Sequence, residues 1–461
     1  MADWIGAAAA AQRLGIKQAS LYSYVSRGVL TRRTGPDGRA SLFDAGEVEG
    51  LARRGRPRRE PGAAELVIES ALTEIGADRF WYMGLDATVL ATSRTFEEVA
   101  SLLWTGSLDD AATPWRATSE AIAVGSAAQA ALPAGTLPLE RLQVIVPALA
   151  ATDPLRLQLD QPVVVASARG LIAGLADCLP RAAPGGAGAG AAGSLGAAAD
   201  LSTGQDPSAR ADSGASADSG AGADSSARAD SSARADSSTG ADLGNAAGTS
   251  IAARLAAKIC PRPEQPGLTA VLQAALVLLA DHELAASTLA ARVAASVRAD
   301  PYAVVATGLG AVGGALHGGA SLGAELMLAA AREPSDAPRV VGELIRRGER
   351  IPGFGHFVYK TGDPRSVLLL SMIRDLARDS PRLAVAEAVL AEVRRRGLPE
   401  PNIDFALAAL ADAAGMIRGA GEAVFAVARS AGWLAHALEE YGRKRPIRPR
   451  GIYTGPPADP S

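Results

Sequence analysis

Aromatic residues are scarce in this chain of 461 residues. Phenylalanine, tryptophan and tyrosine together make up 4% of it, whereas hydrophobic residues as a whole make up 48%. Sheets are usually built from β-branched and aromatic residues, while alanine and leucine favour helices. The composition therefore argues against a protein built mainly from sheets and predicts a mostly α-helical fold.

Cysteine and long apolar runs are nearly absent as well. The two cysteines, Cys178 and Cys260, match no metal or redox spacing, which favours small buried side chains in a reducing compartment. No apolar run reaches the length needed to cross a membrane, and Asp3 and Trp4 replace the basic start of a signal peptide. We expect a soluble, cytoplasmic protein without a membrane partner.

Large apolar residues are almost absent from residues 182–247. There the hexad Ala-Asp-Ser-Ser-Ala-Arg repeats from Ala223, and such sequence cannot bury enough surface to form a core. The apolar helical pattern has the same character on both sides. This predicts a disordered low-complexity insertion inside one domain, residues 63–455, and not a linker between two independent folds.

Residues 1–60 read as a separate unit. An alanine-rich helix ends near Gly15, a second helix starts around Gln18, and a Gly-Pro-Asp-Gly turn near three arginines could form a wing. The unit resembles the excisionase and mercury-regulator type of winged helix-turn-helix. That resemblance implies DNA binding through the second helix, with Lys17, Gln18, Ser20, Tyr22 and Arg27 as the residues to test.

The same unit has plainer interpretations. A small helical module can serve dimerisation or decorate an enzyme, and the basic run from Arg53 to Arg59 reads equally well as a solvated linker broken by prolines. Both alternatives stay open beside DNA binding.

Histidines are few, and two of the four stand in glycine-lined turns. His317 lies in Gly-x-x-His-Gly-Gly and His356 in Gly-x-Gly-His, settings in which a ligand can approach backbone and imidazole closely. His282 lies at the end of an apolar helical pattern, where a histidine is usually structural. His436 is expected to pack in the interior.

The other polar candidates are one carboxylate, Asp404, and three arginines, Arg365, Arg429 and Arg448. Arginine forks bind carboxylates in a bidentate manner, so three of them predict a di- or tricarboxylate ligand. Asp404 could then remove a proton next to a carbonyl, while two neutral imidazoles polarise oxygens. These residues predict the formation of a carbon–carbon bond.

Other chemistry is less well supported. No serine or cysteine stands in a nucleophile elbow and no second carboxylate lies nearby in sequence, which disfavours acyl-enzyme and glycosidase mechanisms. A zinc site made of three histidines remains an alternative, although no histidine pair has metal-binding spacing. Arg429 and Arg448 could equally be solvated charges.

An ordered set of motifs gives the chain a family resemblance. The motifs TFEEVASLLWTG, ADHELAAST, GGALHGGA, IPGFGHFVYKTGDPR, PNIDF, ARSAGWLAH and RPRGIYTG occur in this order over residues 63–180 and 248–455. The set resembles the citrate synthase family, which includes methylcitrate synthases. The resemblance implies a large and a small helical domain that close over the substrates, a homodimer, and a role in the tricarboxylic acid cycle.

The resemblance also implies roles for individual residues. Asp404 would take a methyl proton from acetyl-CoA, His317 would stabilise the enol, and His356 would polarise the oxaloacetate carbonyl; no cofactor or metal is required. The remaining assignments are oxaloacetate binding by His282, Arg365, Phe425, Arg429 and Arg448, the last from the partner subunit, and CoA binding by the backbone around Ile351, Gly353 and Gly355.

The chain departs from the family pattern near the expected active site. Ala285 stands where the family commonly has asparagine, so one amide near the substrate is missing, and an aromatic, proline-rich segment before the ADHE motif is replaced by the repeat. The leading hypothesis is condensation of acetyl-CoA or propionyl-CoA with oxaloacetate. The alternatives are a DNA-binding regulator that uses the synthase-like domain as a metabolite sensor, or a protein with both functions.

Overall fold

A computed structural model describes residues 4–14, 21, 25, 30–35, 41–48, 68–108, 114–182, 250–314, 317, 319–443, 445–450 and 454–455. The chain divides into two compact units, one of residues 1–69 with 448–461 and one of residues 70–447. Within these ranges, no helix has both the length and the apolar character needed to span a membrane. The insertion predicted at 182–247 lies outside the described residues except for Ala182.

The described residues of the smaller unit include a three-stranded antiparallel sheet and the helix α1. The strands β1 (Trp4–Gly6), β2 (Arg32–Thr34) and β3 (Ser41–Asp44) pair in the order β1-β3-β2, and α1 (Ala7–Leu14) follows β1 directly. Phe43 and Leu21 are fully buried in a small core of their own. Asp44 caps the helical residues 45–48 by accepting from the backbone N–H groups of Gly46 and Glu47.

This unit agrees with the prediction only in outline. The first helix ends where Gly15 predicted, but Arg32 and Arg33 lie in strand β2 and not in the turn. The five residues predicted to contact DNA, Lys17, Gln18, Ser20, Tyr22 and Arg27, are outside the described residues. The winged-helix assignment is therefore not established here, and a small sheet with a helix is what the fold provides.

The larger unit opens with a small meander and two capped helices. Strands β4 (Thr73–Ile75), β5 (Phe80–Tyr82) and β6 (Leu85–Asp86) form an antiparallel sheet, followed by α4 (Ala87–Ser93) and α5 (Phe96–Thr105). The sequence predicts that Ser93 or Thr95 starts the helix over FEEVASLLW. Thr95 is the cap, because it forms a reciprocal capping box with Glu98 at the start of α5. The cap fixes where the first long helix begins.

The other described elements of this unit are helices, which confirms the predicted mostly α-helical fold class. The first group of helices is α6 (Ser119–Ala130), α7 (Pro138–Ala150), α8 (Gln161–Cys178), α9 (Ile251–Ile259), α10 (Leu268–Leu279), α11 (Ala286–Ser296) and α12 (Pro301–Val312). The second is α13 (Gly319–Ala330), the 3-10 turn η2 (Pro334–Asp336), α14 (Ala337–Arg346), α15 (Pro364–Leu376), α16 (Pro381–Arg395) and α17 (Ile403–Ala414). The last helix is α18 (Ala420–Gly442).

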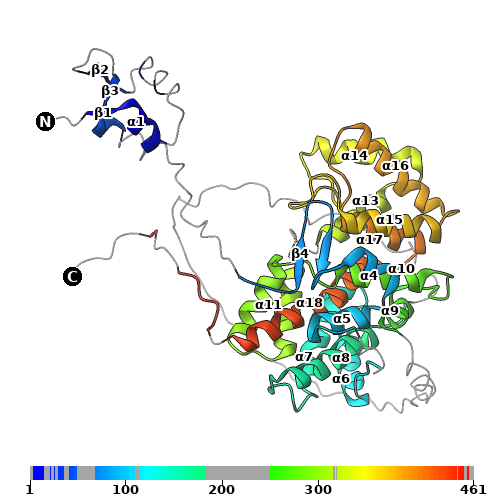
Figure 1. The fold of residues 1–461 in the computed structure, drawn as a ribbon. Helices are drawn as coiled ribbons and strands as arrows, with labels where there is room; N and C mark the ends of the chain where they lie inside the picture. Colours follow the sequence, from blue (N-terminus) through cyan, green and yellow to red (C-terminus); the bar gives the residue numbers. More distant parts are fainter. Residues whose placement is uncertain are drawn as a thin grey trace, which may run out of the picture. The chain divides into compact units, whose positions relative to one another are not determined.

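The second group of helices forms a cluster of its own beside the first group. Helices α13 to α17, drawn in yellow and orange, gather on one side of α4, α5 and α10 (Figure 1). Within that group α13 packs on α17 and α14 packs on α16. The helix α18 returns to the first group, where it packs against α5, α7, α8, α10, α11 and α12.

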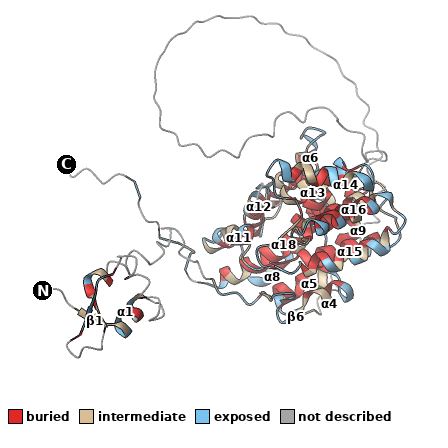
Figure 2. Cartoon of the chain, turned by 90° about the horizontal axis from the view of Figure 1, so that it is seen from above, coloured by how far each residue is buried: buried red, intermediate tan, exposed pale blue. Residues whose placement is uncertain are grey.

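Helix α18 forms the centre of the hydrophobic core. It is buried along most of its length, as Figure 2 shows in red, and Trp433 is fully enclosed. Gly308 of α12 lies so close to it that a Cβ there would be 2.5 Å from the Trp433 ring. The indole Nε1–H of Trp104 donates to the Ala431 carbonyl at 2.9 Å, which anchors α5 to the same helix.

Candidate active site

The predicted site residues of the larger unit lie at the ends of helices. His282 follows α10, His317 precedes α13, His356 lies between α14 and α15, and Asp404 stands in the first turn of α17. Each is thus on a turn that a rigid helix positions. Phe425 and Arg429 lie one turn apart on the same face of α18.

His282, His356 and Tyr359 form one contact cluster. The rings of His282 and His356 meet edge to face with centroids 5.4 Å apart, and the Tyr359 ring lies 4.8 Å from the His356 ring. His282 Nε2 is 3.0 Å from the Tyr359 hydroxyl. Burial, helped by the positive charges of Arg365 and Arg429, lowers the pKa of His282 well below its usual value, so the ring is neutral.

The hydrogen bonds of His356 define its tautomer. Its Nδ1 accepts from the backbone N–H groups of Val358 at 3.1 Å and Tyr359 at 3.3 Å. Burial and the nearby Arg365 lower its pKa to about 4. A neutral ring that accepts at Nδ1 carries its proton on Nε2, so the 3.3 Å contact of Nε2 with Arg365 Nη2, which can only donate, is not a hydrogen bond in this tautomer. The Nε2–H group can instead donate to a substrate oxygen.

His317 is held from both sides. Its Nε2 is 2.8 Å from the Ser287 hydroxyl, and its ring meets the Phe425 ring edge to face at 5.7 Å. Burial and the charge of Arg429 lower the pKa of His317 to about 4. When the Ser287 hydroxyl donates to Nε2, the ring proton is on Nδ1. The Nδ1–H group can then donate to a ligand.

Asp404 is the one carboxylate of the predicted set, and its environment makes it a base. Burial raises the pKa of Asp404 to about 7, and Asp363 adds to the rise while Arg365 and Arg429 oppose it. Among the described residues, no hydrogen bond to its carboxylate oxygens is found, whereas its backbone N–H donates to the Asn402 side chain at 3.0 Å. A poorly solvated carboxylate with a pKa near neutrality suits proton abstraction.

Arg365 forms a buried ion pair with Asp363. Its Nε and Nη2 donate to the two Asp363 oxygens at 2.9 and 2.8 Å, and Nη2 is also 3.3 Å from His356 Nε2. Asp363 caps α15 and accepts from the Ile403 backbone N–H at 3.0 Å, one residue before Asp404. This buried pair therefore ties the His356 turn to the start of α17.

Arg429 is a buried cation without a carboxylate partner in the described part of the chain. Its Nε donates to the Leu279 carbonyl at 2.8 Å, its guanidinium lies 4.7 Å from the Phe425 ring centre, and its Nη2 has no hydrogen-bond partner. Burial lowers its pKa to about 10, which leaves it charged at neutral pH. Since a buried charge is normally paired, this guanidinium has the properties expected of a binding group for an anionic ligand.

The loop predicted to face CoA is pinned to α17. Gly353 and Gly355 have left-handed φ values of 80° and 79°, and a Cβ at Gly353 would meet Phe405 at 2.8 Å. The Asn402 backbone N–H donates to the Gly353 carbonyl at 2.9 Å and its side chain to the Gly355 carbonyl at 2.9 Å. Ile351 is largely buried. The CoA contacts of these three residues stay a prediction.

Arg448 lies outside the larger unit, unlike the other residues predicted to bind substrate. It is exposed and belongs to the smaller of the two compact units. Its predicted role, reaching into the site of a partner subunit, is therefore untested.

Several side chains of the site escaped sequence reasoning. Glu422 is 5% exposed, lies one turn before Phe425 on α18, and has its pKa raised to about 7 by burial and by Glu325, Glu140 and Asp404. Tyr359 and Asp363 were missed because their roles are contacts with other side chains. Phe357, next to His356, is 91% exposed, and Lys360 Nζ lies 5.5 Å from its ring centre. The sequence feature that could have pointed to Phe357 is its position in the motif that contains His356.

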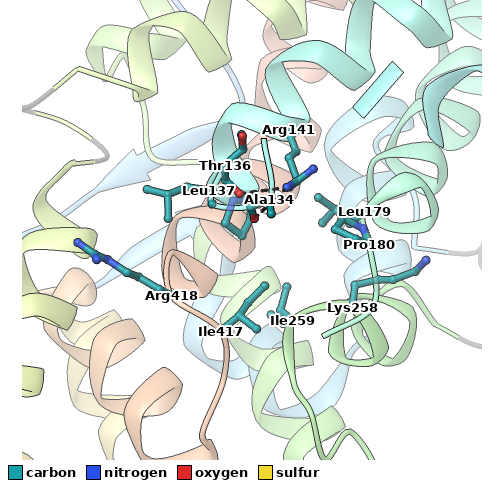
Figure 3. A pocket seen from close by; sticks show the side chains of 12 residues that line it. Ala134, Thr136, Leu137, Arg141, Leu179, Pro180, Lys258, Ile259, Ile417 and Arg418 are labelled. Atoms are coloured by element: carbon teal, nitrogen blue, oxygen red, sulfur yellow. Dashed lines mark hydrogen bonds between the residues drawn. The ribbon is translucent and has the colours of Figure 1, made fainter. Parts of the chain in front are cut away.

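A cavity of about 300 Å³ lies elsewhere. Figure 3 shows the Arg418 and Lys258 side chains directed away from its centre and an apolar floor formed by Ile259 and Ile417. None of the predicted site residues lines it. Within the described ranges, no three His, Cys, Asp or Glu side chains form a group that could hold a metal ion.

Comparison with known proteins gives a likeness in sequence to citrate synthases. Residues 221–450 match the family model of the citrate synthase C-terminal domain. The chain is 40% identical over 189 residues to citrate synthase 2 of Bacillus subtilis, covering 40% of this chain and 50% of that protein. It is 34% identical over 193 residues to the 2-methylcitrate synthase of Shewanella oneidensis, covering 41% of this chain and 51% of that protein.

A solved structure extends the similarity of fold beyond these segments. The ternary complex of carboxymethyl coenzyme A and oxaloacetate with the citrate synthase of Thermoplasma acidophilum has a TM-score of 0.61 at 20% identity. The match covers 86% of this chain and 96% of that one. The aligned sequence spans about half the length of the curated relatives it matches. The likeness in sequence to the citrate synthase C-terminal domain thus lies in residues 221–450, and the likeness in fold to a citrate synthase extends over most of the chain.

Proposed function

We propose that this protein condenses an acyl-CoA, acetyl-CoA or propionyl-CoA, with oxaloacetate and water to give citrate or methylcitrate and free CoA. The observation that carries the proposal is the presence of a candidate base and a buried candidate anion-binding group among the same predicted residues. Asp404 has a pKa of about 7, and Nη2 of the buried Arg429 guanidinium has no hydrogen-bond partner among the described residues. A sensor of carboxylates requires the arginine but not the base.

The first step would be proton removal. The Asp404 carboxylate takes a proton from the α-carbon of the thioester, and the electron pair moves into the carbonyl to give an enol or enolate. His317 donates from Nδ1 to that oxygen, because Ser287 occupies Nε2. His317 is neutral at pH 7 because its pKa is about 4. A neutral imidazole suits this role better than an imidazolium, whose positive charge would also attract the dicarboxylate.

The second step would join the two carbons. His356 donates from Nε2 to the ketone oxygen of oxaloacetate, so the enol carbon attacks a polarised carbonyl and the oxygen receives a proton. Arg429 and Arg365 bind the carboxylates, together with His282, and Phe425 closes the pocket against His317. Water then hydrolyses the new thioester and releases CoA. Closure of the helices over the site would delay that water.

The test is CoA release measured with oxaloacetate and either acyl-CoA. We expect the wild-type protein to be active and Asp404→Asn to lose about 10² to 10⁴-fold in kcat while still binding oxaloacetate. Wild-type protein that binds oxaloacetate yet releases no more CoA than the variant would overturn the enzyme and favour a sensor. Comparing the two acyl-CoAs decides the preference, which a single methylene in an apolar pocket changes only modestly.

DNA binding by residues 1–60 is a second proposal. The antiparallel pair β2–β3 stands where a wing was expected, and β2 presents Arg32 and Arg33 on an exposed strand. Salt-dependent binding of operator-length duplex DNA would support it. Absence of binding at low salt, or binding unaffected by Lys17→Ala with Arg27→Ala, would overturn it.

The homodimer and the contribution of Arg448 from a partner subunit complete the proposal. Both follow from the family likeness. Equilibrium sedimentation gives the oligomeric state, and Arg448→Ala should weaken oxaloacetate binding if the residue reaches a site.

A further inference from the structure

A row of buried polar side chains lies directly behind His282. It begins with Arg292 on α11, continues through His436 on α18 and ends at Asp281, and all three are fully buried. Arg292 is held at its outer end by Glu439 and Glu440. The mechanism above uses none of these residues, and buried ionic groups need a reason for being there.

The hydrogen bonds give the row a direction. Arg292 Nη1 bonds to His436 Nδ1, and because a guanidinium can only donate, Nδ1 must accept. The His436 proton is therefore on Nε2, which lies 3.2 and 3.3 Å from the two oxygens of Asp281. His436 thus accepts a hydrogen bond from Arg292 at Nδ1 and donates from Nε2 to the Asp281 carboxylate.

Asp281 uses its oxygens to shape the turn that contains His282. Its Oδ2 accepts from the Thr73 hydroxyl and, at 3.2 Å, from the backbone N–H of Glu283. Glu283 has a left-handed φ of 54°, which a non-glycine residue adopts only when its surroundings enforce it. Because His282 stands between these two residues, its direction depends on this bond.

The backbone of the turn is held as well. The Tyr82 hydroxyl donates to the Asp281 carbonyl at 3.0 Å, and the Gly432 N–H donates to the Ala280 carbonyl at 2.9 Å. A Cβ at Gly432 would be 2.5 Å from Asp281 Oδ1, so α18 approaches the turn as closely as a glycine allows. His282 then reaches Tyr359 at 3.0 Å.

We propose that His436 and Asp281 are positioning residues for the carboxylate site, and that the Arg292–His436–Asp281 row holds the turn that presents His282 to the dicarboxylate. The proposal rests on the proposed function for the identity of the ligand. Neither residue touches the substrate; both act through His282.

The test compares His436→Leu with His436→Gln. Leucine removes both the acceptor for Arg292 and the donor for Asp281, whereas the glutamine amide can supply both. We expect His436→Leu to raise the oxaloacetate Kd and KM by about 10-fold to 10²-fold, because misplacement of a binding group by an ångström has effects of this size. The KM for acyl-CoA should stay unchanged, and His436→Gln should restore most of the affinity.

A purely structural role would give a different pattern. It would lower Tm and the active fraction but leave the oxaloacetate KM of the folded protein unchanged, and that result would overturn the proposal. Thr73→Val, at a half-buried site, removes one donor to Asp281 and should shift the same KM in the same direction if His436→Leu does not fold.

The positioning role of the Arg292–His436–Asp281 row can be tested even if the proposed function is wrong. Wild-type protein that binds oxaloacetate but does not condense it still allows the Kd comparison by calorimetry. If wild-type protein does not bind oxaloacetate, crystal structures decide: the Glu283 φ and the His282–Tyr359 bond should be lost in His436→Leu and kept in His436→Gln. An unchanged turn in the leucine variant would overturn the proposal.

Discussion

Single side chains in this site are tuned mainly by burial. Burial acts in opposite directions on acids and bases because it disfavours the charged form of each. It raises the pKa of Asp404 to about 7 and lowers those of His317 and His356 to about 4. Asp404 therefore changes its protonation state near pH 7, while His317 and His356 stay uncharged at that pH.

The pH profile should show this directly. Asp404 must be ionised to accept a proton, so kcat/KM should fall tenfold per pH unit below about pH 7 and level off above it. The two histidines, at about 4, do not contribute to that limb. Measuring kcat/KM from pH 5 to 9 checks this; a limb centred near 4 would contradict it. In Glu422→Gln the limb should remain, which excludes the other buried acid as its source.

Arg429 offers a contrast between binding and stability. Arg429→Leu should weaken oxaloacetate binding by about 10-fold to 150-fold, from the 1.5–3 kcal/mol of a charged hydrogen bond. In the ligand-free protein the same change removes an unpaired buried cation, so the free energy of unfolding should not fall and could rise by about 1–3 kcal/mol.

Arg254 is the matched control. It is also buried, but it is paired with Asp177 through two hydrogen bonds. Arg254→Leu should lower the free energy of unfolding by about 3–5 kcal/mol because the Asp177 charge is left behind. Equal losses of stability in both leucine variants, measured by urea unfolding, would contradict an anion site at Arg429.

At the scale of elements, glycines set how closely helices approach α18. Gly308 and Gly310 lie on the same helix, α12, yet only Gly308 faces a neighbour, since a Cβ at Gly310 meets nothing within 4 Å. The close packing of α12 on α18 fixes the helix that carries Phe425 and Arg429. The turn between α14 and α15 depends on glycine in the same way at Gly353.

These two glycines make a matched pair of substitutions. Gly308→Ala should lower the free energy of unfolding by about 1–3 kcal/mol, because the new methyl group would meet the Trp433 ring. Gly310→Ala should raise it by up to about 1 kcal/mol through helix propensity. Urea unfolding measures both; a loss at Gly310 as large as that at Gly308 would show that backbone freedom, and not packing, matters in α12.

At the scale of the whole molecule, the two compact units have separate cores. The residues of the larger unit supply Asp404, three histidines and two arginines of the candidate site. Its chemistry should therefore not require the first sixty residues. A chain that begins at residue 63 should retain the kcat/KM for CoA release and lose any salt-dependent DNA binding.

The truncated and full-length proteins would be compared in the same assay, at equal active-site concentration. Loss of condensation on truncation, in a protein that keeps its helical content and Tm, would contradict independence of the two units. Retained DNA binding would place the nucleic-acid contact outside residues 1–60.

The sequence by itself determined what local chemistry determines: the helical class, the Thr95 cap of α5, the glycine turns around His317 and His356, and the motif order that resembles citrate synthase. It could not find the Asp281–His436 contact, the pairing of Asp363 with Arg365, or Glu422 beside the base, because 155 residues separate His436 from Asp281 and pattern carries no information on such contacts. Only the tertiary structure decided which charges are buried and which lack a partner. Burial is set by packing between distant helices, and here burial raises the pKa of Asp404 and encloses the guanidinium of Arg429, the two features on which the proposed function rests.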